Sequence, residues 1–330
     1  MQAMKSCFLR PAVMRIDYLR ISVTDRCNLQ CIYCNPLPDS NFLERGEILR
    51  FEEIERLVRL FVGCGISRIR LTGGEPLVRR NIVSLVGRLA AAAGVKELLL
   101  TTNGVSLEQM AGELKRAGLK RVNVSLDSPV RETYERITGL DALGKVMGGI
   151  HKAIEVGLTP MKINTVVLRG VNESDTPALA ALSLEMPVTV RFIEYCPTDK
   201  EADVERFFVP NSCVRRRIEE KFGKLAATAA ADSNGPAVYF RISGGLGNIG
   251  FISGKTTYFC HRCNRLRLTS DGKVKPCLYS DVHYDLKKLI RGGADDERIV
   301  GLIKEIMAEK HLYTKLNSFR QSFLMRNVGG

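Results

Sequence analysis

The sequence has no tryptophan, only four histidines, and no uninterrupted apolar run of the about 18 residues that a membrane-spanning helix needs. Its first residues, MQAMKSCFLRPAVMR, contain no apolar core of the length found in secretory signal peptides. We therefore expect a cytoplasmic protein without a membrane segment, whose cysteines stay reduced. Aromatic residues make up 7% of the chain, which disfavours a nucleic-acid surface built from stacked aromatic side chains.

Acidic residues are also scarce relative to basic ones. The chain has 36 Asp and Glu against 49 Lys and Arg, which gives a formal net charge of +13. Such a surplus attracts an anionic partner, whether a nucleotide, a nucleic acid or an acidic protein. Because most basic side chains of any soluble protein lie on its solvated surface, only the positions of individual arginines and lysines can distinguish these partners.

Three of the ten cysteines lie close together in DRCNLQCIYC, residues 25–34. A structural zinc ion takes four ligands, but Cys27, Cys31 and Cys34 are only three, and the next histidine is His151. Iron–sulfur clusters are held by cysteine thiolates, and a four-iron cluster with three protein ligands keeps one iron open. The spacing therefore favours a [4Fe-4S] cluster whose open iron binds a molecule other than protein.

A second trio lies in CHRCNRLRLTSDGKVKPC, residues 260–277. Cys260, Cys263 and Cys277 could form a zinc site if His261 or, with the better spacing, His283 supplied the fourth ligand. The alternative is a second three-cysteine cluster.

Six strand-like runs occupy residues 16–24, 67–72, 95–101, 121–127, 161–168 and 188–195, and helical patterns lie between them. In residues 51–63, for example, apolar side chains recur on one helical face. This alternation predicts an α/β fold, a partial, open β/α barrel of six parallel strand–helix units. After residue 197 the pattern changes, so we place the barrel with the first cysteine trio in 1–197 and a smaller α+β domain with the second trio in 198–330.

The unusual sequences follow the predicted strands directly. DRCNLQCIYC follows the first strand, GGEP (73–76) the second, TNG (102–104) the third and DSP (127–129) the fourth. Active sites of β/α barrels lie at the carboxyl ends of the strands. Gly73 and Gly74 either allow a close approach of the backbone to a cofactor or form a plain turn.

With the aromatic Tyr33 before its last cysteine and GGEP after the second strand, the CxxxCxxC motif resembles the radical S-adenosylmethionine superfamily. RISVTDRCNLQCIYC, RIRLTGGEPLVRR, CNRLRLTSDGKVKPCL and the terminal Gly-Gly resemble, more narrowly, the GTP 3′,8-cyclase family of molybdenum cofactor biosynthesis. This resemblance implies a lyase with two [4Fe-4S] clusters and S-adenosylmethionine. In this family a 5′-deoxyadenosyl radical takes the ribose 3′ hydrogen of GTP, and the resulting radical attacks guanine C8, which gives 3′,8-cyclo-7,8-dihydroguanosine 5′-triphosphate.

The resemblance also implies roles for individual residues. The two trios would hold the clusters, and S-adenosylmethionine would contact Tyr33, Gly74, Ser125 and Cys196. Two positions depart from the family pattern, because Cys196 replaces the usual methionine and Asn35 replaces an apolar residue. Gly329 and Gly330 would enter the catalytic pocket. The GTP-binding residues would be Arg20, Arg70, Thr101, Lys162, Arg191, Arg265, Leu266 and Arg267.

The strand-borne cations fit this implication. Within their strands, Arg20 and Arg70 alternate with apolar neighbours and so point to one face of the sheet. Lys162 and Arg191 do the same two strands further on. A charge inside a parallel sheet is costly unless it is paired or bound to a ligand, which favours a bound triphosphate over a solvated surface.

Two other classes of function remain possible from the residues. A peptide-modifying radical enzyme usually carries more auxiliary cysteines, and a metal-stabilised nucleic-acid-binding protein is favoured only by net charge. For the cyclase we expect GTP as substrate, an unidentified electron donor and a pterin-forming enzyme downstream, no membrane or nucleic acid, and a monomer or homodimer.

Overall fold

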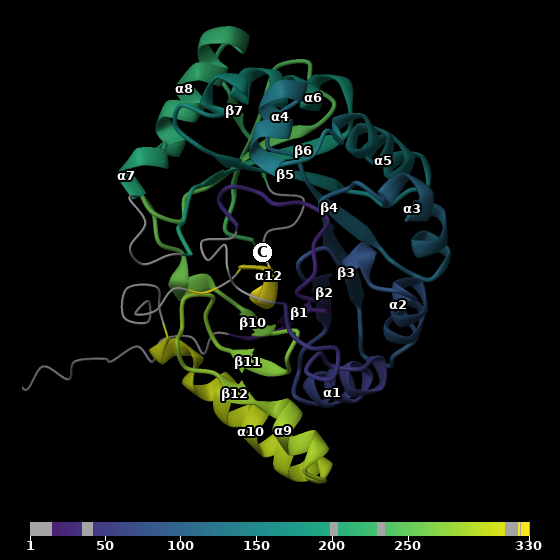
Figure 1. Ribbon diagram of the computed structural model, residues 1–330. Coiled ribbons are helices and arrows are strands. Elements are labelled where there is room, and N and C mark those ends of the chain that lie inside the picture. The colour runs from purple at the N-terminus through teal and green to yellow at the C-terminus, as the bar shows by residue number, and fades with distance from the viewer. Residues whose placement is uncertain are drawn as a thin grey trace, which may run out of the picture.

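The computed structural model describes residues 15–34, 42–198, 204–229, 235–313, 323 and 325–329. Its strands form one twelve-stranded sheet in the order β12-β11-β10-β1-β2-β3-β4-β5-β6-β9-β8-β7. The sheet curves, and the helices between its central strands lie around its outer face (Figure 1). None of the helices in these ranges is long and apolar enough to cross a membrane.

The central six strands pair in parallel and in chain order. Each ends within two residues of its predicted range, and the sheet does not close, so the predicted open β/α barrel is confirmed. The strands are β1 (Tyr18–Ser22), β2 (Arg68–Thr72), β3 (Glu97–Thr102), β4 (Arg121–Ser125), β5 (Met161–Val167) and β6 (Val188–Glu194).

The connecting helices cover the outer face because each has one apolar side. In α1, for instance, Ile54, Leu57, Val58 and Phe61 are fully buried. The helices are α1 (Phe51–Gly63), α2 (Ile82–Ala90), α3 (Leu107–Arg116), α4 (Arg131–Thr138), α5 (Leu143–Glu155) and α6 (Thr176–Glu185), with short 3-10 turns η1 (Pro76–Val78) and η2 (Glu173–Asp175).

The remainder of the chain extends both edges of this sheet. Strand β9 (Asn248–Ile252) pairs in parallel with β6, and β10 (Arg265–Leu268) pairs in parallel with β1. The division at residue 197 therefore stays a prediction, because strands from both sides of it share one sheet. The other elements are α7 (Val204–Phe207), α8 (Asn211–Phe222), β7 (Ala226–Ala227), β8 (Val238–Arg241), η3 (Cys260–Arg262), β11 (Lys273–Lys275), β12 (Tyr284–Asp285), α9 (Leu286–Arg291), α10 (Asp296–Glu309), η4 (Lys310–Leu312) and α12 (Met325–Val328).

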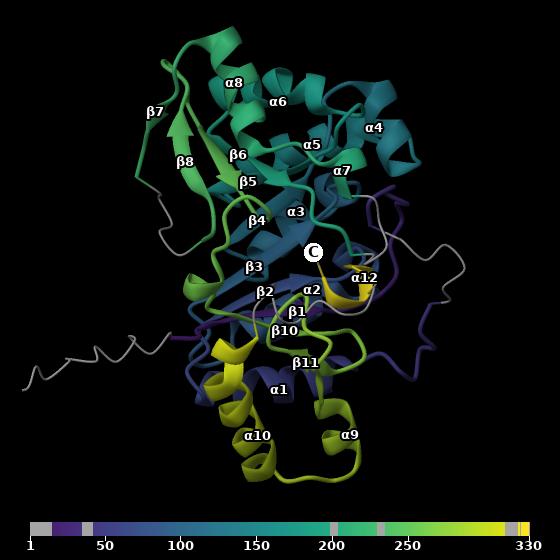
Figure 2. The ribbon, with the colours of Figure 1, turned by 90° about the vertical axis from the view of Figure 1, so that its left-hand side faces the viewer.

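Alternation along the strands separates an apolar outer face from a polar inner face. In β1, Leu19 and Ile21 are fully buried in the core, whereas Tyr18 and Arg20 line a cavity on the inner face. Helices α9 and α10 lie beside β12 (Figure 1) and extend past the ring of strands, whereas α12 returns to its centre (Figure 2). The inner face is therefore enclosed by strands from the whole length of the chain.

Candidate functional site

The first cysteine trio lies in the loop after β1. Main-chain hydrogen bonds fix this loop: Gln30 N donates to Thr138 O at 2.9 Å, and Ile32 N donates to Ile137 O at 3.0 Å. The end of α4 thereby holds the segment between the first and last cysteine.

The GGEP loop packs directly on the same segment. Gly74 N donates to Thr24 O at 2.7 Å, and Glu75 N donates to Arg26 O at 2.8 Å. A Cβ atom at Gly74 would lie 2.3 Å from Arg26 O, so no larger residue fits this backbone. The sequence left open whether these glycines form a plain turn or a close approach, and the structure shows a close approach to the cysteine loop.

The buried Glu75 carboxylate connects this loop to the one after β3. It accepts hydrogen bonds from Thr102 Oγ1 at 2.7 Å and from Asn103 N at 2.6 Å. Burial raises the pKa of Glu75 to about 7. The side-chain amide of Asn103 lies 3.9 Å from Cys27 Sγ. The motifs after the first three strands therefore form one connected structure around the cysteines.

The chemistry of the first trio suits an iron–sulfur cluster. Burial, followed by the negative charges of Asp127, Cys34 and Cys27, holds the pKa of Cys31 well above its usual value, and burial raises that of Cys34 to about 12. The raised pKa values mean that these half-buried thiols ionise only with a cationic partner, which the iron of a cluster supplies. Within the described ranges, no three His, Cys, Asp or Glu side chains are grouped so as to hold a single metal ion.

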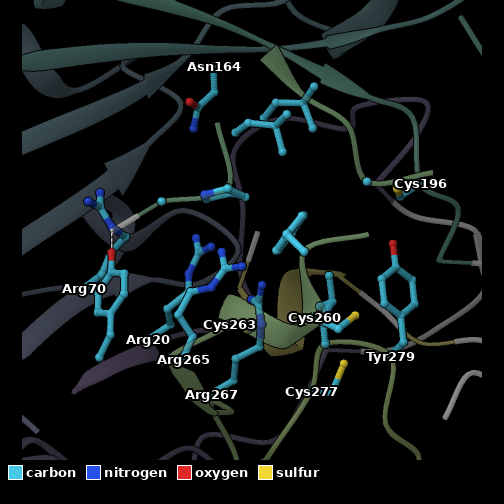
Figure 3. Close-up of a pocket in the computed structure, with 18 of the residues that line it drawn as sticks. Arg20, Arg70, Asn164, Cys196, Cys260, Cys263, Arg265, Arg267, Cys277 and Tyr279 are labelled. Atoms are coloured by element: carbon cyan, nitrogen blue, oxygen red, sulfur yellow. Dashed lines mark hydrogen bonds between the residues drawn. The ribbon is translucent and has the colours of Figure 1, made fainter. Parts of the chain in front are cut away.

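The side chains expected to contact S-adenosylmethionine lie on several elements, and these contacts stay predictions. Tyr33 donates a hydrogen bond from its hydroxyl group to Asp127 Oδ2 at 2.6 Å, and Ser125 ends β4. Cys196 lines the inner cavity (Figure 3). Asn35 lies outside the described residues.

A cavity of about 310 Å³ occupies the inner face of the sheet. No Asp or Glu is found among the described residues that line it. Of the predicted GTP-binding residues, six line this cavity: Arg20, Arg70, Lys162, Arg191, Arg265 and Arg267. Figure 3 labels Arg20, Arg70, Arg265 and Arg267 among them. Arg68, Arg121 and Lys310 line it too, although their sequence context did not identify them.

These cations are buried or half-buried, and several act on one another. Burial, followed by the charge of Arg267, holds the pKa of Arg20 well below its usual value. Burial and then the charge of Arg265 lower the pKa of Arg267 to about 10. An anion in the cavity would relieve this repulsion, so the wall is suited to a polyanionic ligand.

Neutral groups hold two of these guanidinium groups in place. Arg70 donates through Nη1 to Leu100 O at 2.9 Å and to Thr101 Oγ1 at 3.3 Å. Arg191 donates through Nε to Asn164 Oδ1 at 2.9 Å. Since these partners carry no charge, the arginines keep their full positive charge for a ligand.

The second trio lies at the other end of the strands. Cys260 and Cys263 precede β10, which runs parallel to β1, so they lie at the amino end of the sheet, whereas the first trio follows the carboxyl end of β1. All three cysteines line the cavity (Figure 3). Burial opposes ionisation of Cys263, but the charges of Arg265 and Lys310 dominate and lower its pKa to about 6. His261 and His283, the candidate zinc ligands, are exposed.

The carboxyl-terminal segment enters the same site. Helix α12 contacts β1 and lies at the centre of the ring of strands (Figure 1). The carbonyl oxygen of Gly329 accepts a hydrogen bond from Arg267 Nη1. Gly330 lies outside the described residues.

Residues 21–182 match the radical SAM superfamily, and residues 188–316 match the family described as Molybdenum Cofactor Synthesis C. The chain is 45% identical to the GTP 3′,8-cyclase of Moorella thermoacetica over 96% of this chain and 98% of that protein. It is 47% identical to the GTP 3′,8-cyclase of Thermodesulfovibrio yellowstonii over 86% and 88% of the two chains.

The chain belongs to the GTP 3′,8-cyclase family. The predicted membership is thereby confirmed, and as a radical SAM family the cyclases use a [4Fe-4S] cluster and S-adenosylmethionine. Crystal structures of Streptococcus suis SuiB share the fold at lower identity: one has a TM-score of 0.59 at 14% identity and covers 94% of this chain and 77% of that one.

Two residues predicted from the cyclase family to bind GTP lie elsewhere. Thr101 is not part of the cavity wall but accepts a hydrogen bond from Arg70. Leu266 is fully buried in the core opposite Leu19, so only its main chain could face a ligand. Alternation along β10 would have shown this, because Arg265 and Arg267 point to the other face.

Proposed function

We propose that this chain is a GTP 3′,8-cyclase, which converts GTP to 3′,8-cyclo-7,8-dihydroguanosine 5′-triphosphate in the first step of molybdenum cofactor biosynthesis. The observation that carries this proposal is the inner cavity, whose described wall combines buried and half-buried cations and a cysteine trio with no carboxylate. Such a wall suits a nucleoside triphosphate better than a peptide, whose backbone is neutral.

The first trio would hold the cluster that cleaves S-adenosylmethionine. With one iron left open, a [4Fe-4S] cluster held there and reduced by an external electron donor would supply the electron for the cleavage of S-adenosylmethionine to methionine and a 5′-deoxyadenosyl radical. The protein contributes the fixed loop of Cys27, Cys31 and Cys34, and Gly74 brings its backbone against that loop. Tyr33, Gly74, Ser125 and Cys196 would position the cofactor towards the cavity.

The strand-borne cations would hold the triphosphate. Arg20 and Arg70 are register neighbours on β1 and β2, and Arg191 lines the same cavity from β6. Guanidinium groups bind phosphate oxygens in pairs. Lys162 and Arg267 would add positive charge to the same cavity wall. The second trio, at the other side of the cavity, would hold a second cluster that receives the guanine base beside Arg265.

The test begins with anaerobic purification and analysis of iron and sulfide. We expect about eight irons per chain, and, with S-adenosylmethionine and a reductant, 5′-deoxyadenosine and cyclised nucleotide only when GTP is present. A Cys277→Ala variant should lose about half of the iron, whereas Cys64→Ala, a free thiol outside both trios, should keep all of it. A content of four irons plus one zinc per chain, or formation of 5′-deoxyadenosine that does not depend on GTP, would refute the proposal.

The electron donor, a pterin-forming enzyme downstream and the choice between monomer and homodimer are further predictions. The surplus of positive charge supports an acidic electron donor.

A further inference from the structure

Lys310 is a cavity residue that no sequence motif indicated. It lies where α10 ends and η4 begins, and only 3% of its surface is exposed. Its Nζ donates a hydrogen bond to Pro276 O at 2.6 Å. Because Pro276 directly precedes Cys277, Lys310 is attached to the segment that carries the second trio.

The ammonium group of Lys310 has more hydrogen-bonding capacity than its protein partners use. A lysine ammonium carries three protons, but among the described residues it makes one side-chain hydrogen bond and no ion pair. Its charged neighbours on the cavity wall include Arg265 and Arg267. A buried cation with unused donors is costly without a ligand, so its remaining protons are available to an acceptor in the cavity.

The position of Lys310 suggests which part of the substrate provides that acceptor. Arg20, Arg70 and Arg191 lie on the strands that would hold the triphosphate, whereas the hydrogen bond to Pro276 places Lys310 beside Cys277. Guanine presents two acceptors, O6 and N7, along one edge, but adenine presents an amino donor in place of O6. A lysine here would therefore distinguish the two purines.

We propose that Lys310 binds the guanine base of GTP by donating hydrogen bonds to O6 and N7 next to the second cysteine trio. This role rests on the proposed function, which places the base at that side of the cavity. It makes Lys310 a residue that selects the base, whereas the arginines bind the phosphates common to all nucleoside triphosphates.

The test compares three variants of the anaerobically purified, cluster-loaded protein. Lys310→Met removes the charge, Lys310→Arg retains it, and Lys304→Met changes an exposed lysine of α10, the helix that precedes Lys310. Equilibrium binding is measured for GTP, for ITP, which keeps O6 and N7, and for ATP, which lacks O6. We expect Lys310→Met to bind GTP and ITP about tenfold or more weakly, and to lose clearly less affinity for ATP, which keeps only the N7 acceptor. Lys310→Arg should lose less than Lys310→Met, and Lys304→Met should match the wild type.

Iron content and turnover are measured for the same proteins, so that a lost base contact can be distinguished from a lost cluster. Unchanged GTP affinity in Lys310→Met, or an equal loss for GTP and ATP, would overturn the proposed base contact. Loss of iron from that variant would assign Lys310 a purely structural role and overturn it too. The proposed function is judged separately on the wild type: if it binds GTP but forms no cyclised product, that function fails while the comparison of affinities still decides the role of Lys310.

Discussion

Replacing Gly329 by alanine should expel the carboxyl-terminal segment from the site. Gly329 has a φ angle of +77°, and a Cβ atom there would lie 2.2 Å from Thr72 Cγ2. Its carbonyl oxygen accepts the hydrogen bond from Arg267, so the segment contacts a cation of the cavity directly. Alanine therefore disturbs both the backbone conformation and the packing at this contact.

The cost can be estimated from these two effects. A left-handed conformation costs a non-glycine residue about 1–2 kcal/mol. Relief of the contact with Thr72 requires a shift of more than about 1 Å, and overpacking of this kind costs about 1–3 kcal/mol. Together these costs amount to about 2–5 kcal/mol. The equilibrium constant for docking of the segment should therefore fall by roughly 30-fold to several thousand-fold, since about 1.4 kcal/mol corresponds to a factor of ten.

The assay is GTP turnover together with iron content, for wild type, Gly329→Ala, Thr72→Ser and the double variant. Gly329→Ala should keep its iron and lose at least about 30-fold in turnover if docking is required for catalysis. Thr72→Ser removes the methyl group that obstructs a Cβ at position 329. Gly329→Ala should therefore lower turnover less in the Thr72→Ser background than in the wild type, because only the conformational cost of the left-handed backbone remains. Wild-type turnover in Gly329→Ala, or no recovery in the double variant, would refute the reasoning.

Three further perturbations address other parts of the structure. Gly74→Ala should lower iron content by about half and abolish cleavage of S-adenosylmethionine, while Gly87→Ala, where a Cβ meets nothing within 4 Å, should change neither; full iron in Gly74→Ala would contradict the close approach. The hydrogen bond from Arg291 lowers the pKa of Glu53 from 4.5 to about 2, so the pair stabilises the fold above pH 4.5 and less as the pH falls towards 2. The free energies of unfolding by denaturant should differ by about 1–3 kcal/mol between wild type and Glu53→Gln at pH 7, and should converge as the pH falls from 4.5 to about 2. A difference that does not depend on pH would exclude this linkage. Cys196→Met should reduce 5′-deoxyadenosine formed without cyclised product, measured as the ratio of the two, because a thiol in the cavity can donate a hydrogen atom to a radical; equal ratios would remove that role.

Much of the fold could be predicted because its signals are local. The strands ended within two residues of their predicted ranges, since apolar runs closed by glycine mark each strand–helix unit. Helices α9 and α10 were not predicted, and the two-residue strands β7 and β12 have too few residues to show any period.

The candidate site was only partly predictable for the same reason. The motif residues and the alternating strand arginines are visible in the sequence, and six of the eight predicted GTP-binding residues line the cavity. Lys310, by contrast, lies at the end of a surface helix and enters the cavity through a contact with Pro276, 34 residues away in the chain. No periodic pattern in the sequence predicts such a contact.

The sequence by itself determined the six parallel units, the two cysteine trios and the charge of the inner face, because each depends on spacing within a few residues. The tertiary structure alone decided that β10 pairs with β1, which brings the second trio to the cavity, and that Gly329 reaches Arg267. Those contacts join segments more than 60 residues apart. They depend on how strand edges pair and how a chain end packs, which is set by the whole sheet and not by any short stretch of sequence.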